Sequence, residues 1–149
     1  MTQAHEVRQQ IVDWALARVD APYAEHGWGP VAWDCIGFFS QGGIQSGVLD
    51  YDFQKEEDPV LRKYTSSSHP TVMKRALEKY TVRVPREDAM LGDGFLFRAP
   101  KAQHLGIIVR LNPIYVVHAK KAKWKVCHEI IRNTFYVSSC WRYPGLVDG

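Results

Sequence analysis

The sequence predicts an α+β fold, in which helices from the first half pack on an antiparallel sheet formed by the second half. Two observations support this order. Apolar residues recur at helical spacing in the first half, whereas from residue 94 onward they alternate with a period of two. Since 149 residues is the length of one ordinary domain, we expect a single domain over residues 1–149.

Three helices are expected. The first covers residues 3–19 and ends before Pro22, because a proline pushes the residue before it toward extended backbone. The second begins at Cys35, with Asp34 as its N-cap. The third runs from residue 70 to about residue 80, with a proline at its first position.

An antiparallel sheet of five to six strands is expected in the second half. The connections between strands are only a few residues long, which favours a meander in which each strand pairs with the next. The five strands that the pattern predicts are 94–99, 104–110, 114–119, 124–130 and 139–144.

The hairpin between the second and third of these strands carries two histidines. Positions 104 and 118 are symmetric about Leu111, and the turn residues Asn112 and Pro113 lie close to that midpoint. In this register His104 and His118 face each other, with Cβ atoms roughly 4.5 to 5.5 Å apart. A slip of two residues leaves them diagonal neighbours, whereas a slip of one sends them to opposite faces.

Cys35 is a candidate nucleophile. A thiol at a helix N-terminus beside an imidazolium has its pKa lowered to roughly 3.5 to 7.5 and becomes a thiolate. His104 is the candidate base and later the acid for the leaving amine, and His118 would orient its ring. These are the roles found in cysteine hydrolases. A core thiol is the alternative interpretation of Cys35.

Four blocks of the sequence resemble the NlpC/P60 family of papain-like cysteine peptidases, whose members cut peptidoglycan stem peptides. The blocks are Tyr23 followed by "GWGP" and "WDCIGFF", then "MLGDGFLF", then "QHLGIIV", and finally "YVVHA". Ile36 stands where the wider family usually has serine, and Ile108 replaces a common tyrosine. The closing "CWRYPG" and the tryptophan before "DC" most resemble the branch found in phage tails and gene transfer agents.

The resemblance implies a role for each matching residue. The implied catalytic residues are Cys35, His104 and His118. Those implied on the oxyanion and substrate-binding side are Tyr23, Trp33 and Asp34. The Tyr23 hydroxyl and the backbone N–H of Cys35 would stabilise an oxyanion, while Asp34 serves mainly as the helix cap. Asp93 is interpreted as a turn residue. Loops 20–33 and 50–69 are expected to wall the substrate groove.

The resemblance also implies a substrate and partners. The expected bond lies in a peptidoglycan stem peptide, typically between D-γ-glutamyl and a diamino acid, and is cut without a metal or organic cofactor. Phage tail proteins are the further partners it implies. Two alternatives stay open: a zinc site made of Cys35, His104 and His118, and a non-catalytic wall-binding or tail module on the same fold.

The composition argues against several other classes of protein. A net charge of +3 is too small for a dedicated nucleic-acid binder, and "AKKAKWKV" is more typical of a solvated hairpin tip. Three cysteines without a CxxC pair suggest neither a disulfide framework nor a zinc ribbon. No apolar run is long enough to span a membrane, and the N-terminus lacks the features of a signal peptide. We therefore expect synthesis in the cytoplasm. The resemblance implies later action in a virion tail or at the cell wall.

Overall fold

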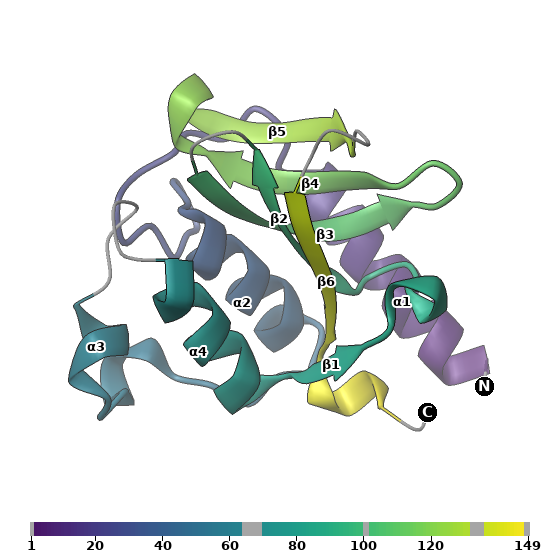
Figure 1. Ribbon diagram of the computed structural model, residues 1–149, viewed down its shortest axis with the longest axis horizontal. Coiled ribbons are helices and arrows are strands. Elements are labelled where there is room, and N and C mark those ends of the chain that lie inside the picture. Colours follow the sequence, from purple (N-terminus) through teal and green to yellow (C-terminus); the bar gives the residue numbers. More distant parts are fainter. Residues whose placement is uncertain (1, 64–69, 100–101, 132–135, 148–149) are drawn as a thin grey trace.

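The computed structural model describes residues 2–63, 70–99, 102–131 and 136–147. The helices are α1 (Thr2–Leu16), α2 (Cys35–Gln45), α3 (Pro59–Arg62) and α4 (Pro70–Tyr80). The strands are β1 (Val82–Val84), β2 (Gly94–Ala99), β3 (Ala102–Arg110), β4 (Tyr115–Lys120), β5 (Lys125–Ile130) and β6 (Tyr136–Arg142). They form one antiparallel sheet, with α1 and α2 packed against it (Figure 1), so the predicted α+β class is confirmed.

The order of the strands differs from the predicted meander at its last member. Strands β2 to β5 pair in sequence, but β6 returns to pair with β2, and β1 pairs with the outer side of β6. Burial explains this order. Strand β6 buries Trp141 in one apolar cluster and Cys140 in another, so it needs an interior position. Strand β5 has exposed and half-exposed positions along its length and is suited to an edge.

The helix boundaries agree closely with the sequence pattern. Helix α2 begins at Cys35 and α4 spans Pro70–Tyr80, as predicted. Helix α1 ends at Leu16 rather than at residue 19, because the chain turns and reaches a positive φ of 77° at Asp20. None of the described helices is both long enough and apolar enough to cross a bilayer.

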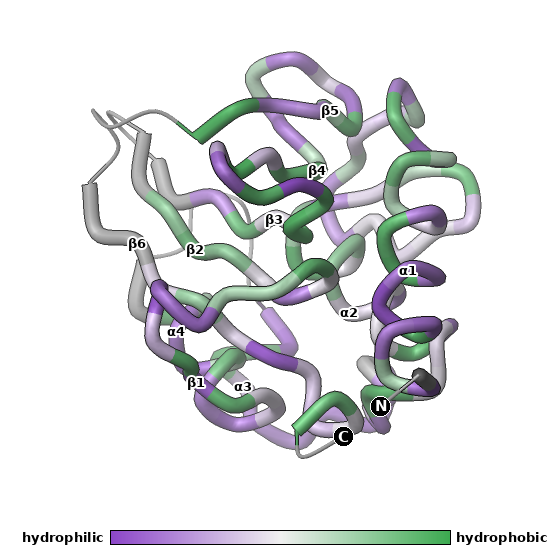
Figure 2. Tube along the Cα trace, turned by 90° about the vertical axis from the view of Figure 1, so that its right-hand side faces the viewer, coloured by the Kyte–Doolittle hydropathy of each residue, from purple (hydrophilic) through white to green (hydrophobic). Residues whose placement is uncertain are grey.

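Apolar side chains cover both faces of the sheet. The larger cluster lies between the sheet and the helices α1 and α2 and includes Phe38 and Ile107. The smaller cluster includes Ile108 and Phe97 and lies on the opposite face, because successive residues of a strand point to opposite sides. Figure 2 shows hydrophobic residues along β2 and mainly hydrophilic ones on the outer turns of α1.

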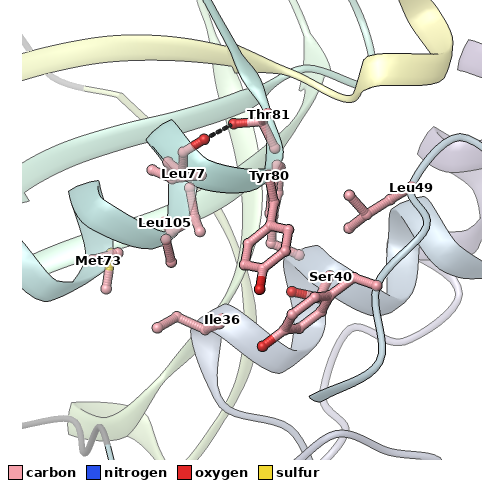
Figure 3. Close-up of a pocket in the computed structure, with 11 residues that line it drawn as sticks. Ile36, Ser40, Leu49, Met73, Leu77, Tyr80, Thr81 and Leu105 are labelled. Atoms are coloured by element: carbon pink, nitrogen blue, oxygen red, sulfur yellow. Dashed lines mark hydrogen bonds between the residues drawn. The ribbon is translucent and has the colours of Figure 1, made fainter. Parts of the chain in front are cut away.

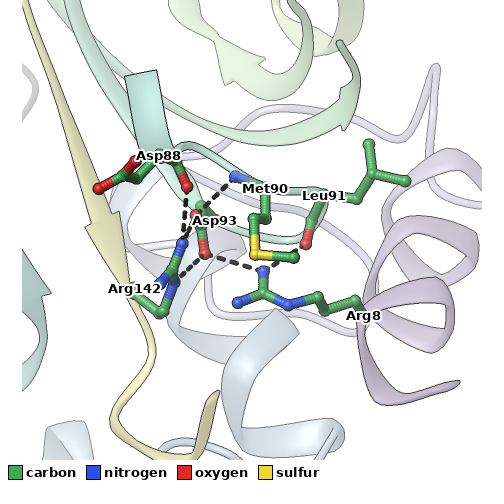
Figure 4. Close-up of polar contacts among 6 residues, drawn as sticks. All are labelled: Arg8, Asp88, Met90, Leu91, Asp93 and Arg142. Atoms are coloured by element: carbon green, nitrogen blue, oxygen red, sulfur yellow. Dashed lines mark hydrogen bonds and ion pairs between the residues drawn. The ribbon is translucent and has the colours of Figure 1, made fainter. Parts of the chain in front are cut away.

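The buried carboxylate of Asp93, just before β2, joins three distant segments (Figure 4). Its oxygens accept hydrogen bonds from Arg8 of α1 at 3.0 Å and from Arg142 of β6 at 2.9 and 3.0 Å. The backbone N–H of Met90 donates a further bond at 2.9 Å. The Asp93 side chain is fully buried, so its charge depends on these donors. The interpretation of Asp93 as a simple turn residue was therefore incomplete.

Replacing Asp93 should be strongly destabilising. Asp93→Ala leaves two guanidinium groups without their buried partner, and we expect the free energy of unfolding to fall by about 3–5 kcal/mol. Chemical denaturation with urea measures the loss. Asp88→Ala is the matched control, because Asp88 is exposed and its hydrogen bond with Arg142 is accepted by the backbone carbonyl, which alanine keeps. A loss below about 1 kcal/mol for Asp93→Ala would contradict this expectation.

Candidate active site

The start of α2 is fixed by a buried cap. The carboxylate of Asp34 accepts a hydrogen bond from the backbone N–H of Gly37 at 2.6 Å, as the N-cap prediction required. The Asp34 N–H in turn donates to the carbonyl of Gly27 at 2.8 Å. A Cβ on Gly37 would lie 2.2 Å from that same carbonyl oxygen, so glycine is needed for this close approach. Cys35 is therefore held as the first residue of the helix.

The surroundings of Cys35 differ from those that the sequence predicted. The residue is half-buried against the larger apolar cluster. Burial, and next the carboxylate of Asp34, raise the pKa of the Cys35 thiol to about 12, although backbone N–H groups of Ile36 and Leu105 act in the opposite direction. The prediction of a standing thiolate is therefore wrong for the free protein. The effect of Leu105 places the sulfur beside the residue that follows His104.

The two histidines of the hairpin come together, although not in the predicted register. In β3 and β4, Ile107 pairs with Val117, so His104 and His118 are offset by two residues. The cause is a four-residue turn at 111–114 with an irregularity in the ladder just before it. Direct cross-strand pairing is thus wrong, but the histidines stay on one face as diagonal neighbours. Their ring centroids are 5.3 Å apart, with an angle of 81° between the rings.

His104 is neutral near pH 7. Burial, and next the proximity of His118 and Lys120, lower the pKa of His104 to about 4. Its ring also stacks on Phe97, with centroids 5.3 Å apart. No hydrogen bond joins the Cys35 thiol to either imidazole within the described ranges. Such bonds are often long or absent before substrate binds. The free protein thus presents an uncharged thiol and an uncharged base.

His118 is anchored by a residue that the sequence analysis missed. Its side chain is 1% exposed, and its Nε2 lies 2.9 Å from Oε1 of Glu129 on β5. Lys120 donates to the same oxygen at 2.9 Å. The bond to His118, followed by that to Lys120, outweighs burial and lowers the pKa of Glu129 to about 2. Its position was open to prediction, because the short hairpin at "KKAKWK" sets Glu129 diagonally across from His118.

The residues expected on the oxyanion and substrate-binding side are mostly buried. Tyr23 is 7% exposed and forms a bridge with Trp33, and its ring lies 5.8 Å from that of Trp124. Trp33 is 3% exposed and packs edge-on against Trp14 and Phe38, so its indole is a core group with little surface to offer a substrate. The roles of the Tyr23 hydroxyl and of the catalytic residues stay predictions.

Two hollows lie along α2. A cavity of about 30 Å³ is lined by Ile36 and Leu105, the residues that follow Cys35 and His104, and by α4 residues such as Met73 and Leu77 (Figure 3). A wider groove of about 640 Å³ lies elsewhere on the helix. Its lining comes from the two loops predicted to wall a groove and from α2: His26, Trp28, Gly29, Gln41, Ile44, Tyr51, Asp52 and Gln54. Residues 64–69 of the second loop lie outside the described residues.

Solved structures share this architecture at low sequence identity. NlpC2 from Trichomonas vaginalis matches with a TM-score of 0.64 and 16% identity over 92% of this chain, which spans 46% of the length of NlpC2. The P60 domain of antigen MAP1204 from M. avium subspecies paratuberculosis matches with a TM-score of 0.61 and 14% identity, covering 95% of this chain and 97% of that domain. The NlpC/p60 domain of the peptidoglycan hydrolase SagA matches with a TM-score of 0.55 and 18% identity. The match covers 91% of this chain and 97% of that domain.

Sequence comparison adds nothing to this likeness. No protein-family model matches the chain, and no curated protein matches it. At these identities the structural likeness establishes the fold, which is the papain-like α+β fold of NlpC/P60 domains. The fold expectation of the sequence analysis is thereby confirmed.

The low pKa of His104 predicts a pH-dependent stability. Its pKa is about 4 in the folded protein and about 6.5 when unfolded, so the unfolded chain binds more protons between these values. We expect the free energy of unfolding to be highest above pH 6.5 and to fall as the pH drops toward 4, by at most about 1.4 kcal/mol per unit. Urea denaturation between pH 4.5 and 6.5 measures this slope.

His104→Gln is the control for this measurement. The buried carboxylate of Glu56 and the half-buried one of Glu129 have pKa values of about 2 against an ordinary 4.5, so they add to the slope mainly below pH 4.5. Between pH 4.5 and 6.5 the variant should therefore have a flatter profile than the wild type. Identical slopes in the two proteins would mean that His104 is not the buried neutral base described above.

Proposed function

We propose that this chain is a peptidoglycan hydrolase, and specifically a cysteine peptidase that cuts an amide bond of the stem peptide. The observation that carries the proposal is the position of Cys35, at a capped helix start and beside the residue that follows His104, with His118 next to that histidine. The fold supports it, since SagA, which has the same fold, is named a peptidoglycan hydrolase.

Cys35 and His104 are both uncharged in the free protein, so the thiol proton must move to His104 while the sulfur attacks the substrate carbonyl. His104 takes the proton of the Cys35 thiol as the sulfur bonds to the carbonyl carbon, and the helix N-terminus stabilises the thiolate as it forms. The backbone N–H of Cys35 is available to the oxyanion. His104 then protonates the departing amine, which leaves an acyl group on Cys35. Water, deprotonated by the same imidazole, hydrolyses this thioester and restores the thiol.

The narrower parts of the proposal come from the sequence resemblance. They are a D-γ-glutamyl-diamino acid bond as the target, association with a phage tail or gene transfer agent, and action at the cell wall. Digestion of defined muropeptides, followed by mass analysis of the fragments, identifies the bond that is cut. Fragments ending in D-γ-glutamate would support the first part, and cleavage at any other bond would contradict it.

A zinc site is the second candidate function. It would use Cys35, His104 and His118, but among the described residues no three His, Cys, Asp or Glu side chains are arranged to hold a metal ion. The third candidate is a non-catalytic wall-binding or tail module. Such a module needs no nucleophile. Replacing Cys35 would therefore leave its binding intact, whereas the same change would abolish the activity of a peptidase.

Substitution of the thiol tests the nucleophile. We expect Cys35→Ala to abolish release of muropeptide fragments, because no acyl-enzyme can form, while the melting temperature stays near that of the wild type. Cys127→Ala is the matched control. The Cys127 thiol donates a hydrogen bond to the backbone carbonyl of Lys125, and we expect this variant to keep full activity. Activity retained by Cys35→Ala would contradict the peptidase mechanism.

Chelation separates the peptidase from the zinc hypothesis. Hydrolysis should survive a strong chelator and be lost after thiol alkylation, because the proposed reaction needs the sulfur and no metal. The Cys127→Ala variant, alkylated in parallel, shows whether the loss comes from Cys35. Loss of activity with the chelator and recovery with added Zn²⁺ would favour the metal site instead.

A further inference from the structure

Glu129 forms a hydrogen bond with His118 that takes no part in the proton transfers proposed above. A carboxylate with a pKa of about 2 is ionised near neutral pH and can only accept hydrogen bonds. It lies 2.9 Å from Nε2 of His118, so that nitrogen must carry the proton. In a neutral imidazole one ring nitrogen is a donor and the other an acceptor. The Nδ1 of His118 is then a bare acceptor.

This acceptor is buried and unsatisfied. The Nδ1 atom of His118 has no hydrogen-bond partner among the described residues, and burying such an atom is costly. The ring of His104 lies 5.3 Å away, measured between centroids. Two imidazoles joined by one N–H···N bond have centroids about 5 Å apart, so the separation of the two rings fits such a bond.

The position of Glu129 at the edge of the sheet is unusual for a residue that holds a buried histidine. Glu129 lies on the edge strand β5, and its side chain is 31% exposed, whereas the His118 that it holds is 1% exposed. Lys120, at the end of β4, donates to the same carboxylate oxygen and keeps Glu129 in place. The chain of contacts thus runs from a surface ion pair through His118 toward His104.

We propose that Glu129 is a positioning residue that fixes His118 as the Nε2–H tautomer. His118 Nδ1 then accepts the N–H of His104, so the other nitrogen of His104 keeps the lone pair that removes the proton from Cys35. The inference rests on the proposed function for its effect on turnover. The tautomer itself does not depend on activity and can be measured separately.

Nitrogen NMR of the full chain, labelled with ¹⁵N at histidine, tests the tautomer at pH 7.5. We expect His118 to show a protonated Nε2 and a bare Nδ1, with an Nε2–H that exchanges slowly with water. In Glu129→Ala the slow exchange should be lost. A proton on Nδ1 of His118 in the wild type would overturn the proposal, whatever the activity of the protein.

Kinetics on muropeptides test the effect on turnover. Glu129→Ala should lower kcat by about tenfold or more with little change in KM, because the base is oriented less well while substrate contacts remain. Glu129→Gln keeps an acceptor and should recover part of kcat. Asp20→Asn is the matched control. It removes the ion pair between Asp20 and Lys125, which lies on β5 like Glu129, and should change neither kcat nor KM.

The outcomes separate this inference from the proposed function. If the wild type cleaves muropeptides but Glu129→Ala turns over as fast, the positioning role is wrong. If the wild type cleaves nothing, the proposed function fails, and the NMR result still decides whether Glu129 sets the tautomer. A Glu129→Ala protein that does not fold is replaced by Glu129→Gln, for which partial kcat with a slowly exchanging Nε2–H supports the role and full kcat opposes it.

Discussion

The arrangement of the whole molecule depends on the ion pairs of the buried Asp93 carboxylate. This carboxylate brings Arg8 of α1 and Arg142 of β6 to the turn that precedes β2, although these residues are far apart in the sequence. A charge without solvent exposure is tolerated only when it is paired and hydrogen-bonded. Satisfying Asp93 therefore places β6 beside β2 and the start of α1 against the same end of the sheet.

Strand β3 lies between β2 and β4, in the interior of the sheet, and α2 packs on it there. The Asp34 cap and the close approach at Gly37 hold the first turn of that helix. Burial at this contact raises the pKa of Cys35 and lowers that of His104, so both groups are uncharged in the free protein. The same packing that positions the two groups thus disfavours the ion pair that helix position alone would suggest.

The edge of the sheet formed by β5 has two roles. Strand β5 presents charged groups to solvent, as an edge strand needs in order to avoid pairing with other chains. One of these groups, Glu129, also bonds to the most deeply buried of the site residues. An edge can supply such an anchor because its carboxylate stays partly solvated, which makes its ionised form less costly than that of a fully buried acid.

The sequence by itself determined the features that depend on neighbouring residues. The Asp34 cap, the start of α2 at Cys35 and the strands β2 to β5 follow from local spacing, and His104 and His118 share a face in either even register. Only the tertiary structure decided the place of β6, the ion pairs of Asp93 and the neutral state of Cys35. Helical and strand periods are set by residues a few positions apart, whereas burial and long-range pairing are set by segments that meet only when the chain is folded.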